Sequence, residues 1–237
     1  DAHLPELAGL PAIGTHMRPN AELIVAQKPD LVLQLAGRRE ALLQTEALRK
    51  LGINVLTFEM DSFDKMFDVL EKLGRLTGRE RKAAGLILDW RARLATLPLH
   101  QQGRLCDNCY RRERARHAGE KPVRVFYEVR YPNLLAAGQG SIVNEIIAVA
   151  GGENVVADDK KLVRFNEEAL ILADPDAYLI QKGPMNPDPQ PLSERAHYRD
   201  LRAVRTGRVL VVDEDRFARP GPRAVEAAEG LERWLYP

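Results

Sequence analysis

Short apolar runs that alternate with amphipathic helical stretches constrain the fold of this chain more than any other feature of its sequence. Residues 30–35 and 54–58 have the length and composition of buried strands, and a helical pattern precedes each of them. Further strands are expected at 123–129, 177–181 and 208–212. Because a helix between two strands carries the chain back across the sheet, this order predicts an α/β fold with mainly parallel sheets, whose ligand sites lie beyond the strand ends.

The helical patterns set the expected division of the chain into lobes. They cover residues 21–27, 39–51, 62–73, 79–97, 141–150, 167–172, 192–201 and 223–235. The pattern at 79–97 ends before Pro98 and would form a helix about 28 Å long, enough to join two lobes. We therefore expect an N-terminal lobe, a bridging helix, a polar cysteine-containing insertion and a C-terminal lobe, at residues 1–76, 77–98, 99–121 and 122–237.

Composition excludes some classes of partner. The 35 basic and 34 acidic residues give a formal charge of +1, so we expect no nucleic-acid partner and only local recognition of charge. No apolar run approaches the roughly 20 residues of a membrane-spanning helix. The first residues lack the basic and apolar regions of a signal peptide, which leaves a cytosolic chain and a processed, exported chain as alternatives.

A set of residues recurs at a constant offset of 146 positions. Asn20, Glu22, Pro29-Asp30 and Leu33 return as the equivalent residues Asn166, Glu168, Pro175-Asp176 and Leu179. In both copies the asparagine can cap a helix, the glutamate stands in its first turn, and Pro-Asp separates that helix from a strand. Capping alone explains each copy, but the shared offset favours two equivalent lobes.

Three segments carry a resemblance to a known family. Residues 20–33 (NAELIVAQKPDLVL) and 137–155 (AGQGSIVNEIIAVAGGENV) resemble the lobe signatures of the periplasmic binding proteins for cobalamin, haem and iron siderophores. Residues 215–223 resemble the segment before the last helix of that family. The matches extend from Pro11 to Leu235, with 100–121 outside them. No counterpart of the family's first strand-helix unit, about 35 residues long, is found before Pro11.

The resemblance implies a fold, a location and partners. It implies two α/β lobes joined by one bridging helix (a class III periplasmic binding protein), with a metal chelate held in the cleft between them. The protein would be a periplasmic or lipid-anchored monomer without catalytic activity or an intrinsic cofactor. It would deliver haem, a ferric siderophore or a corrinoid to an ABC permease and its ATPase. Glu22 and Glu168 match the two acids with which family members dock onto the permease.

Candidate ligand-binding residues follow from family position and from the strand ends. His16 stands where relatives place a residue that contacts the ligand, and imidazole is a good axial ligand for haem iron or cobalt. Arg18 would pair with an anionic group beside it. Tyr131 and three arginines lie after expected strands of the second lobe and suit an anionic ligand, namely Arg130, Arg216 and Arg219.

The insertion leaves a second metal site open. Cys106 and Cys109, with His100 and His117, have the residue types of a zinc site, but the flanking spacings match no strong motif. A local disulfide or two free thiols are the alternatives. Other functional classes also stay open: an enzyme that handles a metal cluster or a tetrapyrrole on the same fold, or an intracellular metal-responsive module. Only one cysteine pair is present, which disfavours a cluster enzyme.

Overall fold

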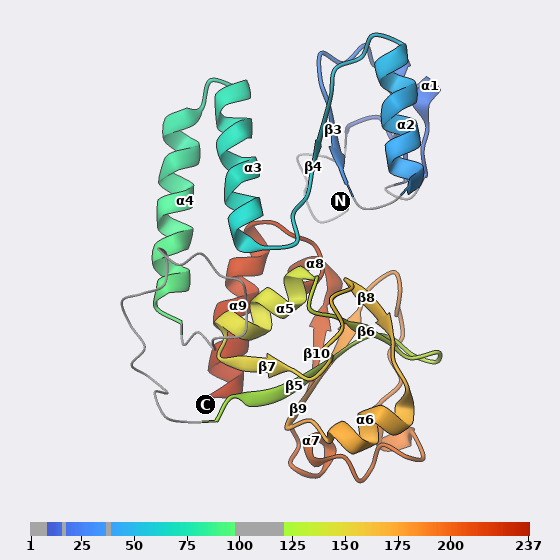
Figure 1. The fold of residues 1–237 in the computed structure, drawn as a ribbon, viewed down its shortest axis with the longest axis vertical. Helices are drawn as coiled ribbons and strands as arrows, with labels where there is room; N and C mark the ends of the chain where they lie inside the picture. Colours follow the sequence, from blue (N-terminus) through green and yellow to red (C-terminus); the bar gives the residue numbers. More distant parts are fainter. Residues whose placement is uncertain (1–8, 16–17, 37–38, 98–120) are drawn as a thin grey trace. The chain divides into compact units, whose positions relative to one another are not determined.

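The computed structural model describes residues 9–15, 18–36, 39–97 and 121–237 (Figure 1). The chain divides into two compact units, Asp1–Glu59 and Met60–Pro237, here called unit 1 and unit 2. Both units contain helices that alternate with strands, so the predicted α/β class is confirmed. No helix in the described ranges combines the length and the apolar character needed to cross a membrane.

Unit 1 is built on two parallel strands. Its elements are β1 (Gly14–Thr15), β2 (Arg18–Pro19), α1 (Ala21–Ala26), β3 (Val32–Leu35), α2 (Arg39–Lys50) and β4 (Val55–Phe58). β3 pairs with β4 in parallel, from Val32 opposite Val55, and α2 contacts both strands. Ile24 and Leu48 are buried. The helices and strands predicted for this part of the chain are therefore confirmed, and β1 and β2 add a short antiparallel pair.

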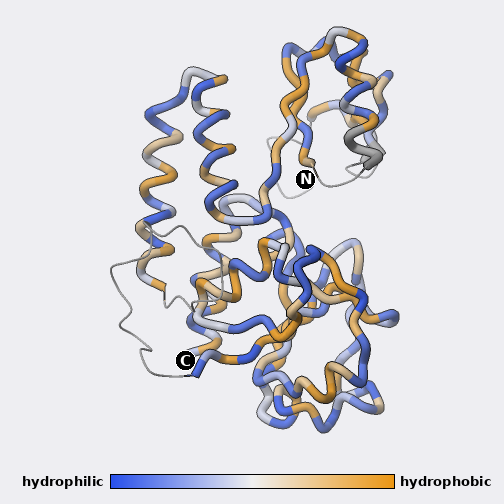
Figure 2. Tube along the Cα trace, in the orientation of Figure 1, coloured by the Kyte–Doolittle hydropathy of each residue, from blue (hydrophilic) through white to orange (hydrophobic). Residues whose placement is uncertain are grey.

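Unit 2 begins with a hairpin of two helices, α3 (Phe63–Leu76) and α4 (Glu80–Ala95). Hydrophobic and hydrophilic residues alternate along both helices (Figure 2), as their periodicity predicts. Phe63 and Phe67 of α3 and Leu94 of α4 are buried. A Cβ atom on Gly74 would lie 2.6 Å from the Cβ of Ala83, so a glycine is required where the two helices approach each other.

A single bridging helix is not confirmed. α4 has 16 residues and is about 24 Å long. It lies within unit 2, where Arg93 donates to Glu229 of α9 (Pro222–Leu235) at 2.7 and 2.8 Å. The division into compact units falls between Glu59 and Met60. The lobe boundaries expected from the sequence stay predictions, and the insertion lies almost wholly outside the described residues.

A mixed sheet forms the centre of unit 2. Its strands are β5 (Val123–Arg130), β6 (Leu135–Ala137), β7 (Gly152–Asn154), β8 (Leu162–Arg164), β9 (Ala177–Lys182) and β10 (Val209–Asp213). The order is β10-β9-β5-β6-β8, and β7 also pairs with β5. β5, β7, β9 and β10 are parallel, whereas β6 and β8 are antiparallel to their neighbours. The sequence led us to expect a mainly parallel sheet, and the antiparallel strands β6 and β8 were not predicted.

Helices cover both faces of this sheet (Figure 1). The first core cluster joins one face to α3, α4, α9 and α5 (Ile142–Val149), and it contains Tyr127, Ile146 and Leu231. The second cluster joins the other face to α6 (Glu167–Ala173) and α7 (Arg202–Arg205), and it contains Phe126 and Tyr178. Phe126 and Tyr127, which are adjacent on β5, are both fully buried, one in each cluster.

The prediction of a helix at 192–201 is wrong. Leu192, Arg195, Tyr198 and Leu201 are all buried, but they are three residues apart. The segment makes successive backbone hydrogen bonds over three residues, from Arg195 to Leu192, from Tyr198 to Arg195 and from Leu201 to Tyr198. A spacing of three matches the 3₁₀ geometry better than the 3.6 residues per turn of an α-helix. Only Leu192–Glu194 is a regular 3₁₀-helix.

Candidate functional site

The carboxyl ends of the parallel strands in unit 2 bring together several polar residues. β5 ends at Arg130, β9 at Lys182 and β10 at Asp213, where α8 (Glu214–Phe217) follows directly. Because the three strands are parallel neighbours, their ends meet at one edge of the sheet. The predicted ligand residues Arg130, Tyr131, Arg216 and Arg219 therefore start from this edge.

Arg130 follows an irregularity in β5. Glu128 lies opposite Ala136 of β6, and Arg130 lies opposite Leu135. An advance of two residues along β5 therefore corresponds to one residue along β6, which is a β-bulge. Such a bulge redirects the side chain that follows it. Arg130 is half-buried, and its Nε atom is buried without a hydrogen-bond partner. No carboxylate of the described residues forms an ion pair with it, which leaves the guanidinium available to a ligand.

Tyr131 is held by a buried ion pair. Glu128 accepts hydrogen bonds from Arg195, one of them 2.9 Å long, and from the hydroxyl of Tyr178 at 2.7 Å. The Cζ atom of Arg195 lies 3.9 Å from the centre of the Tyr131 ring. Burial, together with the charge of Glu128, raises the pKa of Tyr178 well above its usual value. This network fixes the half-buried Tyr131 ring at the end of β5.

The other two predicted arginines differ in their surroundings. Arg219 pairs with Asp215 at 3.0 Å and with Glu214 at 3.5 Å, so its charge is largely balanced within the protein. Glu214 also accepts from Gln181 at 3.0 Å. Arg216 is exposed on α8 and has no ion pair among the described residues. Of these two arginines, Arg216 is thus the more available to an anion.

Two glycines lie in close contact with the backbone of the 158–160 loop. A Cβ on Gly138 would lie 2.6 Å from the carbonyl oxygen of Asp158 and would also collide with that of Lys160. A Cβ on Gly140 would collide with the carbonyl oxygen of Asp159. The segment around Gly138 therefore packs closely against the backbone of the 158–160 loop.

Glu145 is a buried acid that the sequence did not single out. Its side chain lies in α5, where its carboxylate accepts from the backbone N–H of Phe63 and its Oε2 has no partner. Burial is the main cause that raises the pKa of this carboxyl to about 7, and the charges of Asp64 and Asp61 add to it. No pattern in the sequence marks this group, because its burial depends on how α5 packs beside the first turn of α3.

Helices α1 and α6 have the same capping geometry. The Asn20 side chain accepts from the backbone N–H groups of residues 22 and 23, and the Asn166 side chain accepts from those of residues 168 and 169. Glu22 and Glu168 are exposed in the first turns. Ile24 and Leu170, which are also 146 positions apart, are both buried. The predicted repeat is therefore confirmed at the level of local structure.

Some predicted site residues cannot be placed. His16 and all four residues of the possible zinc site, His100, Cys106, Cys109 and His117, lie outside the described residues. Arg18 belongs to β2 through its backbone, opposite Thr15. The described ranges contain no group of three or more histidine, cysteine, aspartate or glutamate side chains suited to a metal ion.

Comparisons with known proteins show which proteins this chain is similar to. Residues 2–98 match the family described as periplasmic binding protein. An ABC transporter substrate-binding lipoprotein of Bacillus subtilis is 28% identical, over 100% of this chain and 71% of the relative. This chain is therefore similar to the periplasmic binding proteins. Its relatives are binding proteins and not enzymes.

Solved structures of similar proteins share the fold. The vitamin B12-binding protein of Vibrio cholerae has a TM-score of 0.74 at 24% identity, with 98% of this chain and 83% of that chain covered. A periplasmic haem-binding protein from Roseiflexus has a TM-score of 0.75 at 24% identity, with coverages of 98% and 85%. The α/β fold expected for this class of binding protein is thereby confirmed, whereas the single bridging helix is not.

Proposed function

We propose that this protein is a periplasmic binding protein, the extracytoplasmic component of an importer that captures a chelated metal and delivers it to a membrane permease. The ligand would be haem, a ferric siderophore or a corrinoid. The observation that carries the delivery step is the equivalence of α1 and α6, each with an asparagine cap and an exposed glutamate. Two equivalent acids suit a two-fold symmetric permease with basic docking pockets, where they add orientation and association rate.

Ligand capture is assigned first to residues of unit 2. In unit 2 the half-buried Arg130 and Tyr131 supply a cation and an aromatic surface, and Arg216 supplies an exposed cation, while Arg219 is already paired. From unit 1 we assign His16 as a ligand contact and Arg18 as its cationic neighbour. This set favours a ligand with an apolar body and anionic groups.

Titration with the three classes of chelate tests ligand capture. Purified protein is mixed with haem, ferric siderophores and cobalamin, and binding is followed by visible absorption and by quenching of tryptophan fluorescence. We expect saturable binding of at least one chelate. If haem binds, His16→Ala should shift the Soret band, because an axial ligand would be lost. Absence of saturable binding to every chelate would contradict the proposal.

A double substitution tests the docking step separately. Glu22→Ala with Glu168→Ala should leave chelate affinity within about twofold, because both side chains are exposed in first turns of helices. The same variant should fail to stimulate the ATPase of the cognate transporter in proteoliposomes. A matched control removes two other exposed glutamates, Glu46 and Glu194, and should retain stimulation. Equal stimulation by both double variants would refute the docking assignment.

A further inference from the structure

Arg130 and Arg164 occupy the same register position on the sheet of unit 2. Arg130 of β5 lies opposite Leu135 of β6, and Leu135 lies opposite Arg164 of β8. Residues directly opposite on neighbouring strands point to the same face, so these three side chains share one face. Neighbouring strands are about 4.8 Å apart, which puts the two arginine backbones about 10 Å apart. Two guanidinium groups can converge on one ligand across that distance.

The bulge in β5 creates this arrangement. Glu128 points toward the second core cluster, where it binds Tyr178 and Arg195. A regular strand would direct Arg130, two residues later, toward the same face. Its partner Leu135 instead packs against the first core cluster. The bulge therefore turns Arg130 to the opposite face, where Arg164 also lies.

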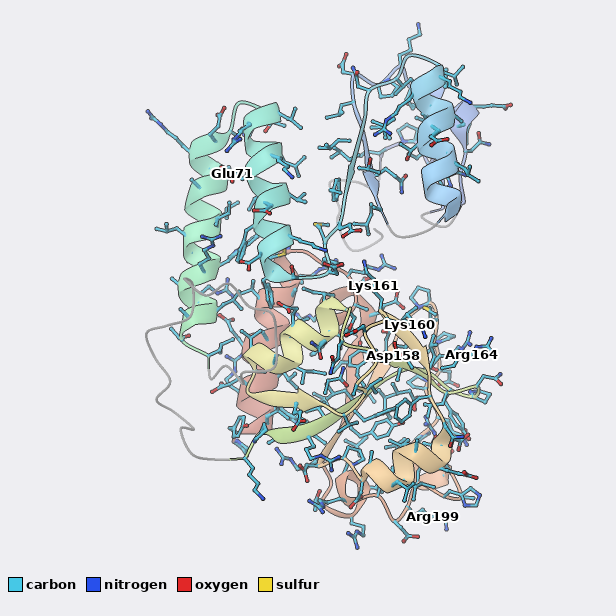
Figure 3. The ribbon with its side chains drawn as sticks, in the orientation of Figure 1. Glu71, Asp158, Lys160, Lys161, Arg164 and Arg199 are labelled. Carbon is cyan, nitrogen blue, oxygen red and sulfur yellow. The ribbon has the colours of Figure 1, made fainter. Side chains whose placement is uncertain are left out.

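Neither of these arginines is neutralised within the described ranges. Arg164 is exposed and forms no ion pair with another described residue, and the Nε atom of Arg130 is buried without a partner. Other cations close by are paired: Lys160 lies 3.4 Å from Asp158, and Lys161 lies 3.3 Å from Asp61. Figure 3 shows both lysines and Arg164 in the same part of unit 2. A buried donor without a partner is costly, and a bound anion would remove that cost.

We propose that Arg130 and Arg164 form a two-armed clamp for an anionic group, on either side of the half-buried Leu135. This inference rests on the proposed function and specifies the class of ligand. The ligand is a chelate whose apolar body lies against Leu135 and which carries at least one carboxylate or comparable anionic group. Guanidinium groups bind such groups through paired, charge-assisted hydrogen bonds. Arg164 thereby becomes a specificity-determining residue.

Matched pairs of chelates test the clamp. The first pair is haem and haem dimethyl ester, which differ only in their carboxylates. The second is an anionic ferric tris-catecholate and a neutral ferric trihydroxamate, and cobalamin is a further probe. Dissociation constants are measured for the wild-type protein, Arg130→Gln, Arg164→Gln and the control Arg199→Gln. Arg199 is exposed and lies far from Arg164 on unit 2 (Figure 3).

The clamp predicts a selective loss of affinity. Arg164→Gln and Arg130→Gln should each weaken the anionic member of the pair that binds by at least about tenfold. The neutral member should change by less than about twofold, and Arg199→Gln should match the wild type. Tighter binding of neutral chelates, or equal effects of all three variants, would overturn the clamp while leaving the proposed function intact. Failure of every chelate to bind the wild-type protein would overturn both. Thermal unfolding establishes that the variants are folded.

Discussion

Glu145 shows how one residue couples the stability of unit 2 to pH. Its carboxylate is buried beside the first turn of α3, and burial raises its pKa from 4.5 to about 7. The folded protein therefore binds this proton more tightly than the unfolded chain does. The stabilisation from that proton is fully present below about pH 4.5 and is lost as the pH rises to about 7.

A neutral replacement of Glu145 should remove this pH dependence. Glu145→Gln keeps a side-chain oxygen that can accept from Phe63 but does not require burial of a charge. We expect it to raise the free energy of unfolding at pH 8 by about 3 kcal/mol and to have little effect at pH 4.5. Urea unfolding across this pH range measures the effect. Glu226→Gln, an exposed change on α9, is the control, and an equal gain at both pH values would contradict the assignment.

Gly138 lies so close to the backbone of the 158–160 loop that there is no space for a side chain. Gly138→Ala would force the backbone of the 158–160 loop to move, because the new Cβ would overlap two carbonyl oxygens. We expect a loss of about 1–3 kcal/mol in the free energy of unfolding, measured with denaturant. Gly85→Ala is a matched control in α4, where nothing lies within 4 Å of the new Cβ. That control should be stabilising by about 0.5–1 kcal/mol.

Among the elements of unit 2, the irregular segment after β9 depends on one ion pair. Arg195 and Glu128 have side-chain exposures of 1% and 0%, and they connect this segment to β5. Arg195→Met should lower the free energy of unfolding by about 3–5 kcal/mol, because Glu128 would be left charged and unpaired in the core. Adding Glu128→Leu should recover most of that loss. If the double variant were as unstable as the single one, packing and not charge would explain the effect.

The sequence predicted the long, periodic elements of the molecule and missed the short ones. The apolar faces of α3, α4 and α9 are strong signals, as are the apolar runs of β5 and β9. β6, β7 and β8 have only three residues each, too few for any alternation to be recognised. The Asn-Glu repeat could be recognised in the sequence because the capping asparagine and the glutamate lie within a single helical turn.

The candidate site was predictable only in part. Arg130 was identified because it ends a strand of the parallel sheet. Arg164 was not, because its position opposite Leu135 depends on the pairing of β5, β6 and β8 and on a bulge that no local pattern encodes. The partners of Arg219, in contrast, are local, because Asp215 and Glu214 lie four and five residues before it.

For the molecule as a whole, β8 is an outer strand of the sheet in unit 2, with an open backbone edge in the described sheet. Exposed edges can pair with another protein chain and start aggregation, and short length and positive charge are common protections. β8 has three residues and carries Arg164, and Lys161 precedes it directly. Neutralising Arg164 would therefore remove a charge that protects this edge from self-association, as well as the proposed ligand contact. Light scattering of the Arg164→Gln protein at rising concentration would reveal whether a single charge keeps this edge from pairing with a second molecule.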